Sequence, residues 1–232
     1  MNSRPVFASV SRSSPLSASD FSSAYWLVAL ALLFTGAGVF FGAAFALPIL
    51  VSGWIFVLFL TEIVLILSAP VWSRTAPLNY ILFFAFPFIS GLTITPFLLS
   101  ILVSYANGAI ILLNATIATT FLTLAAAVFA RSTTINIGQS IGRILLQSLI
   151  GLIVFAILQI FFPSLRGSSF EVVVSGFGII VFSLFLAWDM QRLSLSEKGS
   201  SPFLLALSLY LDIFNLFLYV VRFMLAMSGN RR

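Results

Sequence analysis

Two aspartates stand inside apolar segments near the end of the chain, and their side chains are the best placed to do chemistry. Asp189 lies in GIIVFSLFLAWDM and Asp212 in LLALSLYLDIFNLFLYVV. A carboxylate that faces lipid costs several kcal/mol, so acidic residues inside membrane spans face the protein interior and serve ion or proton pathways. The pair is therefore the first candidate functional site.

The spacing of the two aspartates predicts that they meet. Their midpoint falls in KGSSP, residues 198–202, which has the composition of a turn. If two antiparallel helices reverse there, Asp189 and Asp212 lie level and face each other. Two close carboxylates in a low-dielectric site cannot both ionise cheaply, so we expect the pair to share a proton and sense pH. Their oxygens would also hold Ca²⁺ weakly. The alternative is that each aspartate separately faces water or a backbone partner.

The segment around Asp212 carries polar side chains at helical spacing. In a span otherwise built of Leu, Phe, Val and Ile, such a stripe must face the bundle interior or a wet cavity. We expect the last helix to be central and the stripe to line an ion pathway; for Ser208 and Asn215, hydrogen bonds that only hold helices together are the alternative. The stripe is Ser208, Asp212, Asn215, Tyr219 and Arg222, at intervals of 4, 3, 4 and 3 residues.

Two further charged residues lie within or beside apolar segments. Glu62 is expected to line the pathway or to be a neutral, hydrogen-bonded carboxylic acid. Arg74 is the only charged residue in the stretch from Pro70 to Pro77, which connects two apolar segments. Its side chain is expected either to snorkel to lipid headgroups or to reach a carboxylate. The segment that follows contains Pro87 and Pro96, which predict a kinked or locally unwound helix. Backbone carbonyls that lose their helical hydrogen bonds there would line a pore. The alternative is a kink that has no function.

The composition indicates that most of this chain lies in a lipid bilayer. With 61% hydrophobic residues, 7% charged residues and a mean hydropathy of +1.18, the sequence is that of a polytopic membrane protein. The lack of cysteine and histidine excludes disulfides, thiolate nucleophiles and the usual zinc ligands, and it leaves carboxylates to respond to pH. The net charge of +5 is spread along loops and tails, which does not favour nucleic-acid binding. No cofactor is expected.

Seven apolar segments are long enough to cross a bilayer. Short connections rich in Pro, Gly and polar residues separate them, and none of these connections is long enough for a second domain. The sequence therefore predicts an all-α fold, a single bundle of seven transmembrane helices. The expected spans are 24–46, 48–69, 78–104, 108–130, 140–162, 170–190 and 202–227.

The two ends of the chain differ from the transmembrane domain at 24–227. Residues 1–23 are rich in serine, which predicts a disordered tail or, alternatively, an organellar transit peptide. Residues 228–232 form a short basic tail. Basic residues number seven on the N-terminal side of the membrane and four on the other, which predicts a cytoplasmic N-terminus in the cell membrane, or in an organellar membrane of a eukaryote. The seven are Arg4, Arg12, Arg74, Arg131, Arg143, Arg192 and Lys198, and the four are Arg166, Arg222, Arg231 and Arg232.

Three segments resemble signatures of the Bax-inhibitor-type membrane proteins, also called transmembrane Bax inhibitor motif or lifeguard proteins. They are FPFISGLTITP, SGFGIIVFSLFLAWDMQRL and LALSLYLDIFNLFLYVVRF. The likeness runs from about the first span to the C-terminus. The resemblance implies a seven-helix protein of the bacterial type, with the last helix at the centre and a pH-sensitive calcium leak across the membrane.

The resemblance also implies roles for single residues. Asp189 and Asp212 correspond to the paired aspartates of the family, which share a proton and act as pH sensor and gate. Arg74 falls where the family has a basic residue, or a short basic cluster, that latches onto the pair in the closed state. Glu62 matches an acidic position along the ion path. The expected function is a pH-sensitive calcium leak channel, with the lipid bilayer, Ca²⁺ and H⁺ as its partners.

Three other functions share parts of this pattern. A Ca²⁺/H⁺ exchanger needs the same protonatable acids. Some family members restrain membrane proteases or cell-death machinery by binding, and the N-terminal tail is the only candidate docking segment for that role. Two aspartates in consecutive spans also describe intramembrane aspartyl proteases. Asp212, however, lies in SLYLD rather than in a Gly-x-Gly-Asp context, and no Pro-Ala-Leu segment follows it. A non-enzymatic role is expected.

Overall fold

The computed structural model describes residues 18–194 and 201–229. Residues 1–17 and 230–232, which make up most of the two expected tails, lie outside the described residues. So do residues 195–200, with Lys198 and most of the expected turn. The first helix begins at Ala18, inside the segment expected to be a tail.

Every long element of the described chain is a helix, and seven helical segments are long and apolar enough to cross a membrane. This confirms the all-α, seven-helix expectation. The candidate spans are 23–46, 51–72, 78–104, 108–132, 137–161, 169–193 and 202–228. The helices are α1 (Ala18–Phe41), α2 (Leu47–Ile49), α3 (Ile55–Trp72), α4 (Leu78–Ser104), α5 (Gly108–Ser132), α6 (Ile137–Phe161), α7 (Ser168–Ser194) and α8 (Pro202–Ser228).

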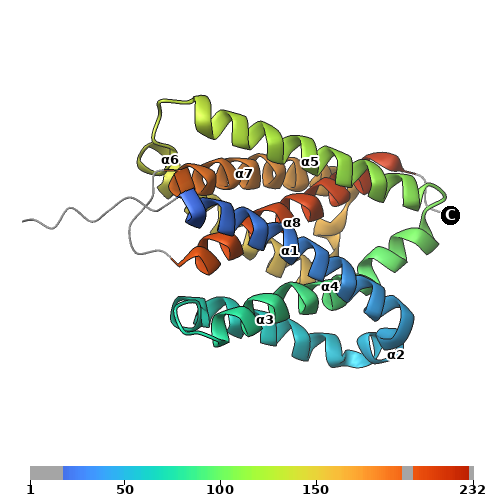
Figure 1. Ribbon diagram of the computed structural model, residues 1–232. Helices are drawn as coiled ribbons and strands as arrows, with labels where there is room; N and C mark the ends of the chain where they lie inside the picture. Colours follow the sequence, from blue (N-terminus) through green and yellow to red (C-terminus); the bar gives the residue numbers. More distant parts are fainter. Residues whose placement is uncertain (1–17, 195–200, 230–232) are drawn as a thin grey trace, which may run out of the picture.

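The last helix is the centre of the bundle, as expected. Half of the residues in the most apolar stretch of α8 are buried, against 11% to 39% in the corresponding stretches of the other spans. α8 packs against α7, α1, α5 and α4, and Figure 1 shows it between α7 and α1. The outer helices present their large apolar side chains to the surface, where lipid replaces water as the surrounding solvent.

Helices α1 and α4 approach so closely that only small residues fit between them. Gly38 of α1 and Gly42, the first residue after α1, are spaced by four residues, and they face Gly91 and Thr95 of α4. A Cβ atom on Gly38 would overlap the carbonyl oxygen of Phe88. Small residues at four-residue spacing allow two helix backbones to touch in a membrane, where packing rather than the hydrophobic effect holds helices together.

Helix α4 is continuous through both of its prolines, so the expected local unwinding is not found. Hydroxyl groups near the prolines add hydrogen bonds to the backbone of the preceding turn. Ser90 donates to the carbonyl of Phe86 (3.1 Å), and Thr95 donates to that of Gly91 (2.7 Å). Hydroxyl side chains and close neighbouring helices commonly allow a transmembrane helix to tolerate proline.

The connections around α3 also differ from the expected breaks. Wide π-type turns, Gly42–Ala46 and Leu50–Trp54, flank α2 where a simple break at Pro48 was expected. At its other end α3 runs through Pro70 to Trp72 rather than stopping at residue 69. The indole N–H of Trp72 donates to the carbonyl of Leu65 (2.9 Å), in the turn that the proline disturbs.

Candidate functional site

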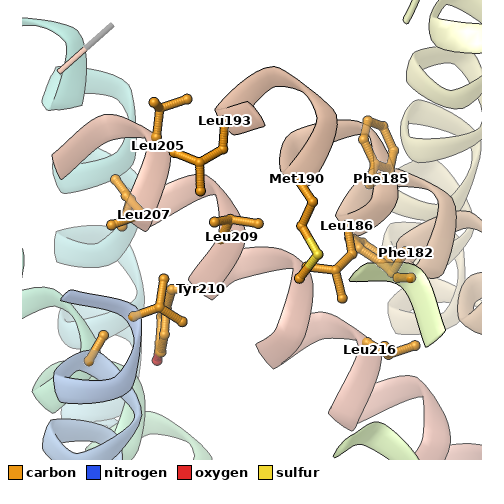
Figure 2. Close-up of a cluster of buried hydrophobic side chains, with 14 of the residues drawn as sticks. Phe182, Phe185, Leu186, Met190, Leu193, Leu205, Leu207, Leu209, Tyr210 and Leu216 are labelled. Carbon is orange, nitrogen blue, oxygen red and sulfur yellow. The ribbon is translucent and has the colours of Figure 1, made fainter. Parts of the chain in front are cut away.

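The candidate site lies on the seam between α7 and α8. Apolar side chains at intervals of three and four residues on each helix form a buried layer there. Figure 2 shows Leu193 of α7 between Leu205 and Leu209 of α8, with Met190 and Leu186 farther along α7. This layer surrounds the polar residues of the seam with hydrocarbon, which strengthens every electrostatic interaction among them.

Asp189 on α7 is almost fully buried, with 4% of its surface exposed. Its Oδ1 atom accepts a hydrogen bond from Nη1 of Arg192, in an ion pair of 3.2 Å between residues one helical turn apart. Its Oδ2 atom accepts a short hydrogen bond from the hydroxyl of Ser208 on α8. The guanidinium of Arg192 also lies over the ring of Trp188, 6.0 Å from its centroid. Asp189 is therefore a carboxylate with a cation and a hydroxyl beside it.

Asp212 on α8 has a different environment. It is 8% exposed, and its Oδ2 atom is buried without a hydrogen-bond partner. The negative charge of Asp189 and the positive charge of Arg192 both act on it. A buried carboxylate oxygen without a hydrogen-bond donor is costly, because it has lost its hydrogen bonds to water.

The two aspartates come together on the seam, but they are offset by one helical turn rather than level. Asp189 lies opposite Ser208, and Gly178 lies opposite Tyr219, in one antiparallel register. Asp212 is four residues beyond Ser208, a rise of about 6 Å. Because side chains lean toward the N-terminus of their own helix, the two carboxylates of this antiparallel pair lean toward each other.

The rest of the polar stripe on α8 also belongs to the interior. Asn215 donates from Nδ2 to the carbonyl of Leu211 in its own helix (2.8 Å). The ring of Tyr219 packs on Gly178 and stacks on Phe182, with 5.5 Å between ring centroids. The stripe thus runs along α7, and its role as lining of an ion pathway stays a prediction.

The sequence reasoning missed an ion-pair cluster at the far end of the seam. Arg222 donates from Nε and Nη2 to the two carboxylate oxygens of Glu171 (3.2 and 3.1 Å), and from Nη2 to Oε1 of Gln159 (2.9 Å). Gln159 in turn donates to Glu171 (2.6 Å) and to the carbonyl of Leu165 (3.1 Å). These residues join the ends of α6, α7 and α8. The acid at the start of α7 and the arginine near the end of the antiparallel α8 were the available signal.

Glu62 lies apart from the aspartates, in a second interior cluster. Thr93 donates to its Oε1 atom (3.1 Å), and the hydroxyl of Ser90, which donates to the carbonyl of Phe86, lies near both Glu62 and Tyr210. The hydroxyl of Tyr210, which is fully buried, makes a 2.8 Å hydrogen bond with that of Thr35. The cluster therefore connects α3, α4, α8 and α1 through one carboxylate and four hydroxyls.

Arg74, the latch candidate, is exposed at the C-terminal end of α3. The carbonyl of the preceding Ser73 accepts a hydrogen bond from the hydroxyl of Ser201 (2.7 Å), which ties this end of α3 to the start of α8. Arg74 thus lies at the same end of the bundle as the aspartates. The arginine seen paired with Asp189 is Arg192, and the role of Arg74 as a latch stays a prediction.

Gln191 anchors the connection between α5 and α6 beside the site. Its Nε2 atom donates to the carbonyl of Ile135 (2.9 Å), and its Oε1 atom accepts from the backbone N–H of Ile137 (3.0 Å). Gly138 and Gly142 of α6 leave room for the ring of Trp188. Gln191 and Trp188 therefore fix the segment of α7 that carries Asp189, a function with no signature in the sequence.

A cavity of about 280 Å³ adjoins the site between α3 and α8. Arg192 and Ser208 are its polar lining residues. Among the described residues, no group of three or more acidic, histidine or cysteine side chains is arranged to hold a metal ion. The two aspartates therefore stay a predicted weak Ca²⁺ site, which the structure does not test.

A family model described as "Inhibitor of apoptosis-promoting Bax1" matches residues 19–230. The chain belongs to the Bax inhibitor-1 family. This Bax inhibitor-1 family protein is 34% identical to an uncharacterised protein of Campylobacter jejuni, over 89% of this chain and 87% of that one. It is 31% identical to an uncharacterised protein of Helicobacter pylori J99, over 85% and 82%. It is 30% identical to the inner membrane protein YbhL of Escherichia coli, over 73% and 71%.

Membership of the Bax inhibitor-1 family confirms the resemblance seen in the three signature segments. Two of those segments are the halves of the α7–α8 seam, and the third is the proline-containing part of α4. The chain is a multi-pass membrane protein of this family.

Proposed function

We propose that this protein is a pH-sensitive calcium leak channel of the cell membrane, gated at the α7–α8 seam. The observation that carries the proposal is the placement of two almost fully buried aspartates on adjacent helices at the centre of a seven-helix bundle. Isolated buried carboxylates are expensive in a membrane protein, and their presence at the bundle centre is typical of an ion or proton pathway.

The gate would work by repulsion between the two carboxylates. With one proton on the pair, the single remaining negative charge is balanced by Arg192, and the seam stays closed. Loss of that proton leaves two negative charges within reach of each other in a layer of hydrocarbon. Like charges in such a site repel strongly, so α7 and α8 would move apart and open the route.

Calcium is the cation that fits the available ligands. The interior offers carboxylate, hydroxyl and carbonyl oxygens, and the chain has neither histidine nor cysteine. Two carboxylates make a weak calcium site, and weak binding suits conduction because the ion must also leave. Glu62, with the hydroxyls of Thr93 and Ser90, offers a second set of oxygens along the bundle. Asn215, Tyr219 and Arg222 continue the polar stripe toward the far end.

The N-terminus is proposed to face the cytoplasm. Arg74, Arg131 and Arg143 lie at the ends of α3, α5 and α6 that share one side of the bundle with Asp189, and basic residues concentrate on the cytoplasmic side of membrane proteins. The name of the Escherichia coli relative, an inner membrane protein, favours a bacterial cell membrane. The aspartates would then sense protons from the cytoplasmic side.

The proposal is tested by calcium flux into liposomes that contain the purified protein. Flux is measured between about pH 6 and pH 8 for the wild type, Asp189→Asn and Asp212→Asn. Asp20→Asn, an acid ahead of the first span, is the matched control. We expect wild-type flux to rise with pH and each seam variant to lose that dependence. Wild-type and seam variants that behave alike would rule out the gate, and flux that dissipates a proton gradient would identify an exchanger instead.

A further inference from the structure

Gln147 of α6 is a polar side chain on the outside of the bundle, at the depth of the bilayer centre. It is exposed, and it lies well inside a helix that begins at Ile137 and ends at Phe161. At a rise of about 1.5 Å per residue, its backbone is about 15 Å from the nearer end of the helix. A hydrocarbon core is about 30 Å thick, so the Gln147 side chain is too short to reach the headgroups on either side.

Helix α6 turns Gln147 away from the rest of the protein. The opposite face of α6 packs on α7, where Gly138 and Gly142 leave room for the ring of Trp188. The side chains around Gln147 are exposed along the length of the helix, at intervals of three and four residues. Together with Gln147 they form one outward surface, called here the Gln147 face, which also contains Arg143, Ile144, Gly151, Val154 and Leu158.

The amide of Gln147 has no hydrogen-bond partner among the residues that the structure describes. Other polar side chains of the spans are satisfied within the chain. Gln159, farther along α6, bonds to Glu171 and Leu165. The exposed hydroxyl of Thr116 on α5 donates to the carbonyl of Leu112 in its own helix (2.9 Å). An amide that faces hydrocarbon without a partner is costly, so a polar group from another molecule is expected to cover Gln147.

We propose that two copies of this chain associate through the Gln147 face, with their Gln147 amides hydrogen-bonded to each other across a twofold axis. A carboxamide has both donors and an acceptor, so it is complementary to a second copy of itself. A second copy with the same orientation in the membrane also presents Gln147 at the same depth. The inference does not rest on the proposed calcium function, because the face lies on the side of α6 away from α7.

Two neighbours of Gln147 fit a contact between two α6 helices. Gly151 lies one helical turn beyond Gln147, and a Cβ atom there would meet nothing within 4 Å. Small residues beside a polar one allow helix backbones to approach in a membrane, where hydrogen bonds and packing hold helices together. Arg143 lies one turn before Gln147, near enough to the start of α6 for its long side chain to reach the headgroups and leave the contact.

The first test counts the subunits of the full-length protein in liposomes, by stepwise photobleaching of a fluorescent label at the C-terminus. We expect dimers for the wild type. Gln147→Leu removes the amide from a side chain without partners in its own chain, and it should weaken association about 3- to 30-fold. Asn114→Leu is the matched control, because Asn114 is an exposed amide near the start of α5, within reach of the headgroups. A monomeric wild type, or equal association of wild type and Gln147→Leu, would overturn the proposal.

The second test locates the interface by cross-linking in the membrane. Because the chain has no cysteine, Val154→Cys and Ile153→Cys each introduce a single thiol. The two positions are similarly exposed, at 49% and 51%, but Ile153 is turned by about 100° from Val154, away from the Gln147 face. Oxidation with copper phenanthroline should join two Val154→Cys chains by a disulfide and leave Ile153→Cys largely monomeric. Equal cross-linking at both positions, or none at Val154→Cys, would contradict the proposed interface.

Discussion

Ser208 of α8 donates a hydrogen bond to Asp189 of α7, one helical turn before Asp212. This contact sets the register of the seam and places a neutral hydroxyl, rather than a second acid, directly opposite Asp189. The two acids therefore interact through space across one turn, with different immediate surroundings.

Removal of the Ser208 hydroxyl should weaken both the seam and the charged form of Asp189. We expect Ser208→Ala to destabilise the protein by about 1–3 kcal/mol, because a buried carboxylate oxygen loses its donor. The midpoint of pH activation should rise, since Asp189 then competes with Asp212 for the proton. Thermal unfolding in detergent and the flux midpoint measure the two effects. Ser100→Ala, an exposed position on α4, is the control; equal behaviour of the two variants would contradict the role of Ser208.

The ion pair of Glu171 and Arg222 should stabilise the far end of the seam. Arg222→Met and Glu171→Gln are each expected to lower stability by about 1–2 kcal/mol, because each leaves a polar partner unpaired in the bundle. A double-mutant cycle on thermal unfolding separates the pair interaction from other effects. We expect the double variant to be clearly less destabilised than the sum of the single ones. Additive effects would show that the two residues act independently.

The contact between α1 and α4 allows a matched comparison of two glycines on one helix. Gly38 touches the backbone of α4, whereas a Cβ on Gly36 would meet nothing within 4 Å. Gly38→Leu should force the helices apart and abolish stable folding, while Gly36→Leu should express and unfold like the wild type. The yield of monodisperse protein after purification and its unfolding temperature test this pair. Similar stability of both variants would contradict the close contact.

Much of the architecture follows from hydropathy and length alone. The spans were predicted to within a few residues because a bilayer fixes how many apolar residues each helix needs. The central place of α8 was predicted from its polar stripe, since such a face cannot turn to lipid. For α4 the local unwinding expected from two prolines was wrong, because the helix continues through both of them and nearby hydroxyl side chains bond to its backbone.

The details of the site were less accessible to sequence reasoning. The midpoint between two residues predicts that helices pair but not their register. Here Asp189 lies opposite Ser208 and Gly178 opposite Tyr219, so the expected level position of Asp212 was wrong by one turn. Arg192 was counted as a loop cation, and only its distance from Asp189 reveals the ion pair. Gln159 and Gln191 act through hydrogen bonds to distant segments, for which spacing along the chain gives no signal.

The central claim is that protonation of the buried aspartate pair controls calcium flux. The most direct test is calcium entry into liposomes between about pH 6 and pH 8, with wild type and Asp212→Asn compared at equal protein content. Asparagine cannot ionise, so it imitates the protonated aspartate at every pH. The account predicts flux that rises with pH in the wild type and a low flux without pH dependence in Asp212→Asn. A variant that still shows the wild-type rise would contradict it.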